Sequence, residues 1–460
     1  MPLKLGVTPP ICPTLRHRPA PQRVDPLAQG PHSRLHPAFC RAAWSMVCPA
    51  SRVAAKQRLA AFVPLAEDYA RDRNYVMPGH PAVSRLSPAI RHRLITEEEV
   101  VSAVLRAHPL GGVEKFVQEV YWRRYWKSWL AHRPDIWAEF VRDLDALPKN
   151  PVVQQVEGAQ SGNRVIDHFA AELVATGYLH NHARMWFAGW WVHQARLPWQ
   201  SGAAFFYRHL LDGDPAANTL SWRWVAGWQT PGKSYLTRRD NLEKYLAPQL
   251  RESLAEGLAA FTDPQALPVP SAARPPVPRL ALPPHPPGPV DPAGLWVHEE
   301  DLAVETSALG ERTWAAIAVT ANVAAWDRWQ FPNAKRQWIS DALRDAGSRA
   351  ESVWRSPALV DTSRPHLAAL LDWARSQRLR SVVALRPDVG PLQDSLPSLE
   401  AGLASQGIRL VLWDRPEDLR LRPLATGGFF PFWERLRKQL LTRAEKNESS
   451  SLAFSPASNA

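Results

Sequence analysis

Two aspartates lie beside a cluster of indole side chains in the stretch DGDPAANTLSWRWVAGW, residues 212–228. Asp212 and Asp214 flank a glycine, Asn218 follows, and three tryptophans come within the next ten positions. An apolar core does not require carboxylates so close to indoles, and a buried carboxylate needs a cation or hydrogen-bond donors. The stretch therefore indicates a polar site inside an aromatic cavity.

A cation for these carboxylates occurs in the stretch TGYLHNHARMWFAGWW, residues 176–191. Asn181, Arg184 and Met185 are spaced so that they share one helical face. If Arg184 pairs with Asp212, a buried ion pair can hold a polar ring within the aromatic surroundings.

An anion site is indicated in HPAVSRLSPAIRHRL, where Ser84 and Ser87 flank Arg85 and Leu86. Pro88 suits the first turn of a helix. Hydroxyl groups and free amide protons at a helix start, next to an arginine, can bind a diphosphate. A serine cap on a surface helix explains the same residues without a ligand.

A third group of side chains occurs in QEVYWRRYW, where Glu119, Trp122 and Arg123 share one helical face. An acid, an indole and a guanidinium together can receive a nucleic-acid base by hydrogen bonding, stacking and phosphate contact. The plainer interpretation is an intrahelical Glu–Arg pair next to a core tryptophan.

Hydrophobic periodicity divides the chain into two structured blocks. Residues 56–262 carry long amphipathic patterns and predict a helical domain. Residues 263–293 form a proline-rich linker, with twelve prolines at positions 264–292. In residues 294–441 short β-prone runs (LWVH, WAAIAV, ESVW, RSVVAL, IRLVLW) alternate with helical runs. The predicted fold class is an all-helical domain followed by a Rossmann-like parallel α/β domain.

The two ends of the chain are predicted to lie outside these domains. Residues 442–460 have the composition of a disordered tail. Residues 1–55 are predicted to be either a disordered basic arm or, with translation starting at Met46, a segment that does not belong to the protein.

Composition narrows the class of protein. The formal charge of +11 on 460 residues suits a polyanionic partner, although a solvated basic surface explains it equally well. No run approaches the length of a membrane helix. All three cysteines lie within the first 48 residues, which is consistent with a reducing, cytoplasmic location.

Taken in order, the motifs resemble the FAD-binding domain of the photolyase/cryptochrome family. The matching patterns are Ser-x-Leu-Ser-Pro, Glu-x-x-Trp-Arg, Gly-x-x-His-Asn-x-x-Arg-Met and Asp-Gly-Asp-x-Ala-x-Asn-x-x-x-Trp-x-Trp. The resemblance covers about residues 60–245 and implies a U-shaped FAD. The FAD-binding residues that it implies are Tyr69, Ser84, Arg85, Leu86, Ser87, Asn181, Arg184, Asp212, Asp214 and Asn218.

The resemblance also implies a route for electrons. Asn218 would face the reactive N5 of the flavin, and asparagine at this place is typical of the repair enzymes in the family. Trp222 would be the first electron donor to the photoexcited flavin, and Trp199 the second. The third family tryptophan falls near Ala146, so the exit stays open among Trp137, Trp186, Trp190 and Trp191.

The implied reaction is the light-driven splitting of a pyrimidine dimer by an electron from reduced FAD, with the dimer flipped out of single- or double-stranded DNA. Glu119 would hydrogen-bond the lesion. The full set of expected DNA contacts is Arg73, Glu119, Trp122, Arg123, Met185 and Trp224. A monomer is expected.

The sequence departs from the family pattern in three ways. His182 replaces an arginine, and SYLTRRDNLEKYL, residues 234–246, replaces a groove-lining Arg-x-Phe-Asn-Pro segment. The α/β domain also follows the helical one instead of preceding it, which we interpret as a circular permutation. A doubly wound sheet of unknown role is the alternative. An antenna chromophore, a folate or a deazaflavin, is compatible with the family, but no motif identifies one.

The sequence is therefore compatible with three functions. The first is a DNA photolyase for cyclobutane dimers or (6–4) photoproducts, which Asn218 favours. The second is a cryptochrome-like receptor without repair activity, which His182 and residues 234–246 favour. The third is a flavin-free nucleic-acid-binding relative. This function is disfavoured, because without a flavin nothing would compensate the cost of burying Arg184 and Asp212.

Overall fold

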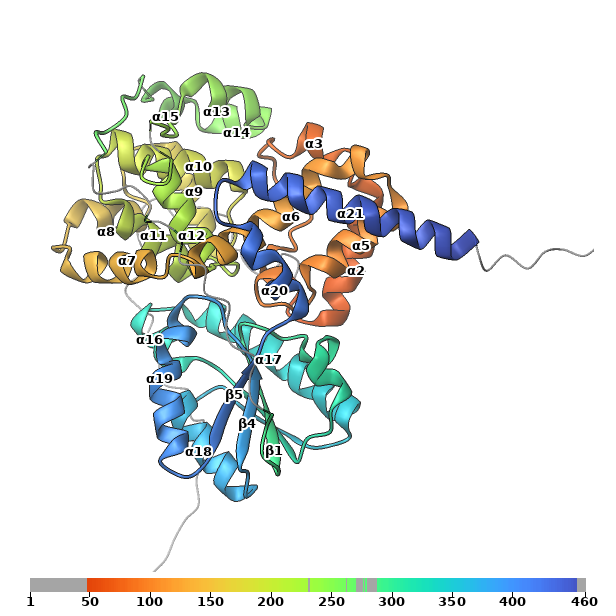
Figure 1. Cartoon of the computed structure of the whole chain (residues 1–460). Coiled ribbons are helices and arrows are strands. Elements are labelled where there is room, and N and C mark those ends of the chain that lie inside the picture. The colour runs from red at the N-terminus through yellow and green to blue at the C-terminus, as the bar shows by residue number, and fades with distance from the viewer. Residues whose placement is uncertain are drawn as a thin grey trace, which may run out of the picture.

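The structure of the protein, a computed structural model, describes residues 48–230, 232–261, 263–269, 276, 278 and 288–452. Expectations for residues 1–47, for most of the linker and for residues 453–460 lie outside these described residues. Figure 1 shows a helical domain with the α/β domain below it. No helix in the described part of the chain is long and apolar enough to cross a bilayer.

The helical domain is built from amphipathic helices with clear end signals. Thr96 and Glu99 form a capping box at the start of one helix, and Gly177 ends another in the left-handed conformation, with a φ of 63°. The helices are α2 (Arg52–Phe62), α3 (Tyr69–Asp72), α4 (Ser87–Arg91), α5 (Glu97–Ala107), α6 (Leu110–Ala131), α7 (Asp135–Ala146), α8 (Pro151–Glu157), α9 (Arg164–Thr176), α10 (Asn181–Gly189), α11 (Trp199–His209), α12 (Pro215–Val225), α13 (Arg239–Tyr245), α14 (Pro248–Ser253) and α15 (Ala255–Ala259).

The α/β domain is a five-stranded parallel sheet in the order β3-β2-β1-β4-β5. The strands are β1 (Ala293–His298), β2 (Ala316–Thr320), β3 (Ala358–Asp361), β4 (Ser381–Leu385) and β5 (Arg409–Trp413). The helices around the sheet are α16 (Val323–Arg328), α17 (Asn333–Trp354), α18 (His366–Ser376) and α19 (Pro391–Ala404). This arrangement confirms the predicted fold class of a helical domain followed by a Rossmann-like domain.

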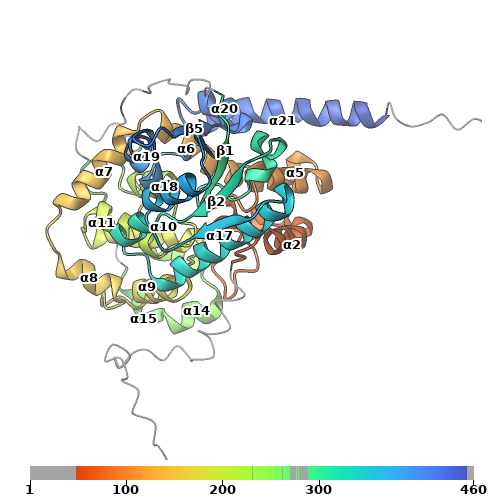
Figure 2. The same cartoon turned by 90° about the horizontal axis from the view of Figure 1, so that it is seen from below.

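Successive side chains of the strands face opposite sides of the sheet. Leu295 and Val297 pack into the core that continues into the helical domain, whereas Trp296 packs under α18 and α19. Figure 2 shows α17 and the pair α18 and α19 on different sides of the strands. The run ESVW, expected as a strand, lies inside α17 instead, because the amphipathic pattern that starts at Asn333 continues to Trp354.

The last helices leave the α/β domain and pack on the helical one. Helices α20 (Pro416–Leu421) and α21 (Phe429–Leu452) follow β5, and Figure 1 shows α21 lying across α6. The Tyr125 hydroxyl donates to the Gly427 carbonyl at 2.8 Å, and the Trp433 indole donates to Glu114 at 2.9 Å. The α/β domain was expected to end at residue 441. The segment from α20 onward already packs on the helical domain before that residue, and α21 continues beyond it to Leu452.

A buried carboxyl group in the sheet predicts a pH-dependent stability. Glu299, next to β1, accepts hydrogen bonds from the Asn322 amide at 3.0 Å and the Trp326 indole at 3.2 Å. Burial raises the pKa of Glu299 to about 7, so the folded chain holds this proton more tightly than the unfolded chain does. The contribution of Glu299 to the free energy of unfolding is therefore fully present below pH 4.5 and is lost as the pH rises to about 7.

We expect Glu299→Gln to remove this pH dependence. The difference in unfolding free energy between the wild type and the variant should change by up to about 3 kcal/mol between roughly pH 4 and pH 8. Urea denaturation at several pH values measures it. Parallel pH curves for the two proteins would contradict the assignment.

Candidate functional site

The expected ion pair between Arg184 and Asp212 is present. Arg184, on α10, donates from Nη1 and Nη2 to the two Asp212 oxygens at 3.1 and 3.0 Å. Its Nε donates to the Leu179 carbonyl at 2.7 Å, which fixes the plane of the guanidinium. Burial by itself would raise the pKa of Asp212, but attraction to Arg184 and Arg123 outweighs it, and the pKa is lowered. Asp212 is therefore ionised at neutral pH.

Asp214 occupies a different environment two residues further on. It is the N-cap of α12, and its Oδ1 accepts a hydrogen bond from the Ala217 amide at 2.8 Å. The side chain is 1% exposed, and its Oδ2 lies 3.2 Å from Lys127 Nζ and 3.6 Å from Arg91 Nε. Burial by itself would raise the pKa of Asp214, but attraction to the charges of Lys127 and Arg91 outweighs this effect, and the pKa is lowered. Lys127 was missed in the sequence, although it follows Arg123 at helical spacing.

A cavity of about 580 Å³ lies between α2 and the segment before α4. Ser84 and Arg85 line it, as expected for an anion site, and Arg58 of α2 joins them. Burial lowers the pKa of Arg58, and the neighbouring charge of Arg85 lowers it further. Two guanidinium groups this close favour a bound anion such as a diphosphate. Because α4 has only five residues, we assign anion binding to side chains and not to its dipole.

The backbone around Arg85 supports a specialised role for this segment. Arg85 has a φ of 53°, in the left-handed region that non-glycine residues rarely adopt. The neighbouring residues hold it there, with the Leu86 amide donating to the Ser84 hydroxyl at 3.3 Å. Strained conformations of this kind are concentrated at ligand sites.

The cavity adjoins the Arg184–Asp212 pair. Cys48 lines the cavity, and burial raises the pKa of its thiol to about 12, with a further contribution from Asp212. Cys48 and the start of α2 at Arg52 are thus part of the folded site. The boundary expected after residue 55 therefore falls too late, because the first turn of α2 already contributes buried side chains.

The expected lesion contact Glu119 is paired within the helical domain. Arg73 Nη1 donates to Glu119 at 2.8 Å, and Lys115 Nζ lies 3.1 Å from the same oxygen. Tyr69 packs edge-on against Phe116, and burial raises the pKa of its hydroxyl. The structure thus brings Tyr69, Arg73 and Glu119 together in one cluster.

Asn218 and Trp222 lie on consecutive turns of α12. The Asn218 amide nitrogen donates to the Ala203 carbonyl at 2.8 Å, which fixes the orientation of the amide. Trp222 is 2% exposed and packs against Gly202, where an added Cβ would lie 2.3 Å from the indole. Only glycine permits this approach of α11 to the Trp222 ring.

Two tryptophan ring pairs involve the expected electron donors, and one of them includes Trp222. The Trp191 ring lies 6.1 Å from that of Trp222, centroid to centroid. Trp199, the expected second donor, contacts Trp228 at 5.8 Å. Trp228 is half-buried, so it joins the open candidates for the exit.

The remaining expected contacts with DNA and FAD differ in how far they are exposed. Met185 and Trp224 are half-buried, and Asn181, expected to bind FAD, is exposed at the first position of α10. Trp122 stacks face to face on Phe429 of α21, with 3.7 Å between ring centroids and 8° between planes. One face of the expected lesion-binding indole is therefore covered by the protein itself.

Comparisons with known proteins match part of the helical domain. Residues 116–245 match the FAD binding domain of DNA photolyase. The deoxyribodipyrimidine photo-lyase of Streptomyces griseus is 33% identical over 151 residues, which are 32% of this chain and 33% of that protein. The enzyme of the same name from Synechococcus is 30% identical over 174 residues, 35% of each chain. The chain thus spans about a third of the length of these relatives.

Solved structures give partial matches. A bacterial class III photolyase from Agrobacterium tumefaciens is 24% identical with a TM-score of 0.35, over 42% of each chain. A cryptochrome from Synechocystis is 18% identical with a TM-score of 0.38, over 45% of each chain.

The matched helical domain, with its Arg184–Asp212 pair beside a basic cavity, defines an FAD-binding flavoprotein. Residues 116–245 are therefore similar to the FAD-binding domain of the photolyase/cryptochrome family. The cofactor of this chain is FAD.

Proposed function

We propose that the protein is a light-driven DNA repair enzyme that splits pyrimidine dimers with an electron from reduced FAD. The observation that carries the proposal is the fixed amide of Asn218 on α12, the same helix that carries Trp222 and follows the Arg184–Asp212 pair. The relatives named deoxyribodipyrimidine photo-lyase support it.

The residues present fit FAD. Arg58 and Arg85 supply positive charge in the cavity, where Ser84 adds a hydroxyl. His80 Nδ1 and Arg123 Nη1 are buried with no hydrogen-bond partner in the described structure, so both can contact a ligand. We assign the diphosphate to Arg58, Arg85 and Ser84, and a polar edge of the flavin ring to Arg184 and Asp212.

Bound FAD supplies absorption of blue light and the electron that opens the dimer. The chain's own residues bind the cofactor, orient it and shield the electron path from water. An amide does not titrate near neutral pH, so Asn218 cannot deliver a proton to the ring nitrogen that it would face. Because the amide nitrogen donates to Ala203, the amide oxygen is left to accept a hydrogen bond, and acceptance from the N5–H that reduced flavin carries would favour the reduced form. Buried aromatic rings around Trp222 exclude water from the electron path.

A receptor role is the second candidate, and one observation favours it. Phe429 covers Trp122, and Arg73 neutralises Glu119, so two expected lesion contacts already have partners in the free protein. A receptor needs neither group for DNA. In that case photoreduction would act through a partner surface.

Light-dependent repair of a defined lesion tests the proposal. Reduced protein is mixed with an oligonucleotide carrying one thymine dimer, and dimer loss is compared under blue light and in darkness. Loss in light only supports the enzyme. No loss from a protein that binds FAD and photoreduces it would favour the receptor, unless a (6–4) oligonucleotide is repaired in the same assay.

Glu119→Gln should lower the quantum yield of this repair by about tenfold or more, because it removes the charge expected to accept a hydrogen bond from the lesion. The FAD content should stay unchanged. The matched control is Glu157→Gln, since Glu157 is also a partly exposed carboxylate paired with an arginine, at 2.9 Å from Arg208. An equal loss of repair and FAD content in Glu119→Gln would make Glu119 structural.

A further inference from the structure

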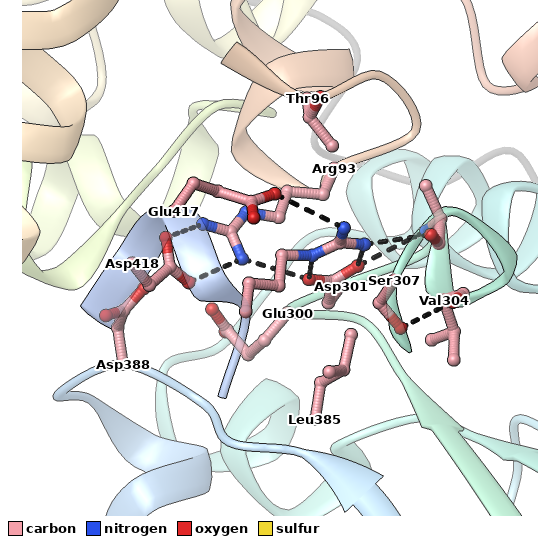
Figure 3. A network of polar contacts seen from close by, with 12 residues as sticks. Arg93, Thr96, Glu300, Asp301, Val304, Ser307, Leu385, Asp388, Glu417 and Asp418 are labelled. Carbon is pink, nitrogen blue, oxygen red and sulfur yellow. Dashed lines mark hydrogen bonds and ion pairs between the residues drawn. The ribbon is translucent and has the colours of Figure 1, made fainter. Parts of the chain in front are cut away.

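The carboxyl edge of the sheet is filled by cations from the helical domain. In a parallel sheet of this order, ligands usually bind where the strand order reverses, here between β1 and β4. Arg93 of the helical domain instead contacts Asp301 at 3.0 Å and Asp418 at 2.7 Å. Figure 3 shows this guanidinium between the two carboxylates, with Glu300 and Asp388 nearby. Arg124 extends the network to Asp388 at 2.8 Å.

Two further cations, Arg91 and Lys127, reach the Asp-Gly-Asp segment of the flavin site. Arg91 forms a bidentate pair with Glu300 at 2.7 Å, while its Nε donates to the Gly213 carbonyl at 3.1 Å. Lys127 Nζ lies 3.3 Å from Asp388 and 3.2 Å from Asp214. Each cation therefore links one acid of the α/β domain with one residue of the flavin site.

These links are buried, and no hydrogen bond from a described residue holds Oδ2 of Asp214. The side chains of Arg91 and Lys127 are 3% and 4% exposed. Asp214 Oδ2 has no hydrogen-bond partner among the described residues, so its position depends on the two charges that face it. A cation that lost its second carboxylate would move toward Asp214 or become hydrated, and either change would displace the segment.

We propose that Glu300 and Asp388 of the α/β domain are positioning residues for the flavin site. They hold Arg91 and Lys127, and these hold Gly213 and Asp214 in the geometry that binds FAD. The α/β domain is thereby a structural part of the flavin site. The inference rests on the assignment of Asp214 to the flavin site, but it does not depend on which reaction follows.

The test measures FAD affinity in Asp388→Asn and Glu300→Gln proteins by quenching of flavin fluorescence. We expect the Kd of each variant to rise about tenfold, because small displacements of binding groups have effects of at least this size. Asp301→Asn is the matched control. Asp301 is also a buried acid between the domains, but it contacts Arg93 and Arg415 and neither Arg91 nor Lys127. Its variant should lose thermal stability and keep the FAD Kd within about twofold.

A double-mutant cycle separates positioning from loss of structure. In a Lys127→Met background, Asp388→Asn should have little further effect on the FAD Kd, because the link is already broken. Equal rises in Kd for Asp388→Asn and Asp301→Asn, or an unchanged Kd in Asp388→Asn and Glu300→Gln, would overturn the inference. A wild-type chain that fails to bind FAD would instead overturn the flavin site itself.

Discussion

Arg184→Ala is expected to yield protein without flavin. The substitution leaves Asp212 buried at 5% exposure with its bidentate partner gone, and with Arg123 at 3.7 Å and the Ser87 hydroxyl as groups among the described residues that still stabilise its charge. Removing one partner of a buried ion pair costs about 3–5 kcal/mol, which corresponds to a loss of FAD affinity of a hundredfold or more. The ratio of flavin absorbance to protein absorbance after purification measures the loss.

Arg208→Ala is the control for this substitution. Arg208 is 25% exposed against 21% for Arg184, and it pairs with Glu157 in the same helical domain. Its variant should stay yellow. A yellow and stable Arg184→Ala protein would contradict the placement of the flavin ring beside Asp212.

The same pair gives a direction to the acid sensitivity of the wild type. The pKa of Asp212 is lowered in the folded chain, so the stability that its charge contributes is present above the unfolded pKa and is lost as the pH falls through the folded pKa. Arg184→Ala should weaken this acid dependence, because attraction to Arg184 is the main force that opposes the effect of burial. Acid titration of both proteins, followed by circular dichroism, measures the difference.

Trp222→Phe is expected to keep FAD and to slow its photoreduction by about a hundredfold or more. Phenylalanine fits the space against Gly202, but its ring is far harder to oxidise than an indole. Flavin content and photoreduction rate under blue light with an external reductant measure the two effects. Trp296→Phe, which alters a fully buried indole in the α/β domain, is the control and should leave the rate unchanged.

Three further variants identify the route beyond Trp222. Trp191→Phe should slow photoreduction if electrons pass through the ring contact at 6.1 Å. Trp199→Phe and Trp228→Phe should both slow it if electrons pass through the 5.8 Å pair. An unchanged rate in Trp222→Phe would reject both routes at once.

Much of the flavin site was predictable from the sequence, because its parts are local. The Asp-Gly-Asp stretch predicts a pairing with Arg184, because a buried acid needs a cation and few other cations lie in helical register. Ser84 and Arg85, expected at an anion site, line the cavity, and the binding of an anion there stays a prediction. The fold class was predictable for the same reason, because periodicity reports which face of each element is buried.

Packing between distant segments was not predictable, because periodicity does not say what covers a buried face. Nothing near Trp122 in the sequence indicates that Phe429 stacks on it. The run ESVW has β-prone residues, yet it forms the end of α17, and β3 starts only at Ala358. The ends of the domains were misjudged for the same reason, since α21 packs on α6 and not on the sheet that precedes it.

The sequence by itself predicted the resemblance to the photolyase/cryptochrome family, the cofactor and the Arg184–Asp212 ion pair, since each depends on side chains a few turns apart. Only the tertiary structure decided how the two domains share that site. Lys127 of the helical domain contacts both Asp388 of the α/β domain and Asp214, because the carboxyl edge of the sheet docks against α6. Long-range ion pairs leave no periodic signal, so their partners become known only when the chain is folded.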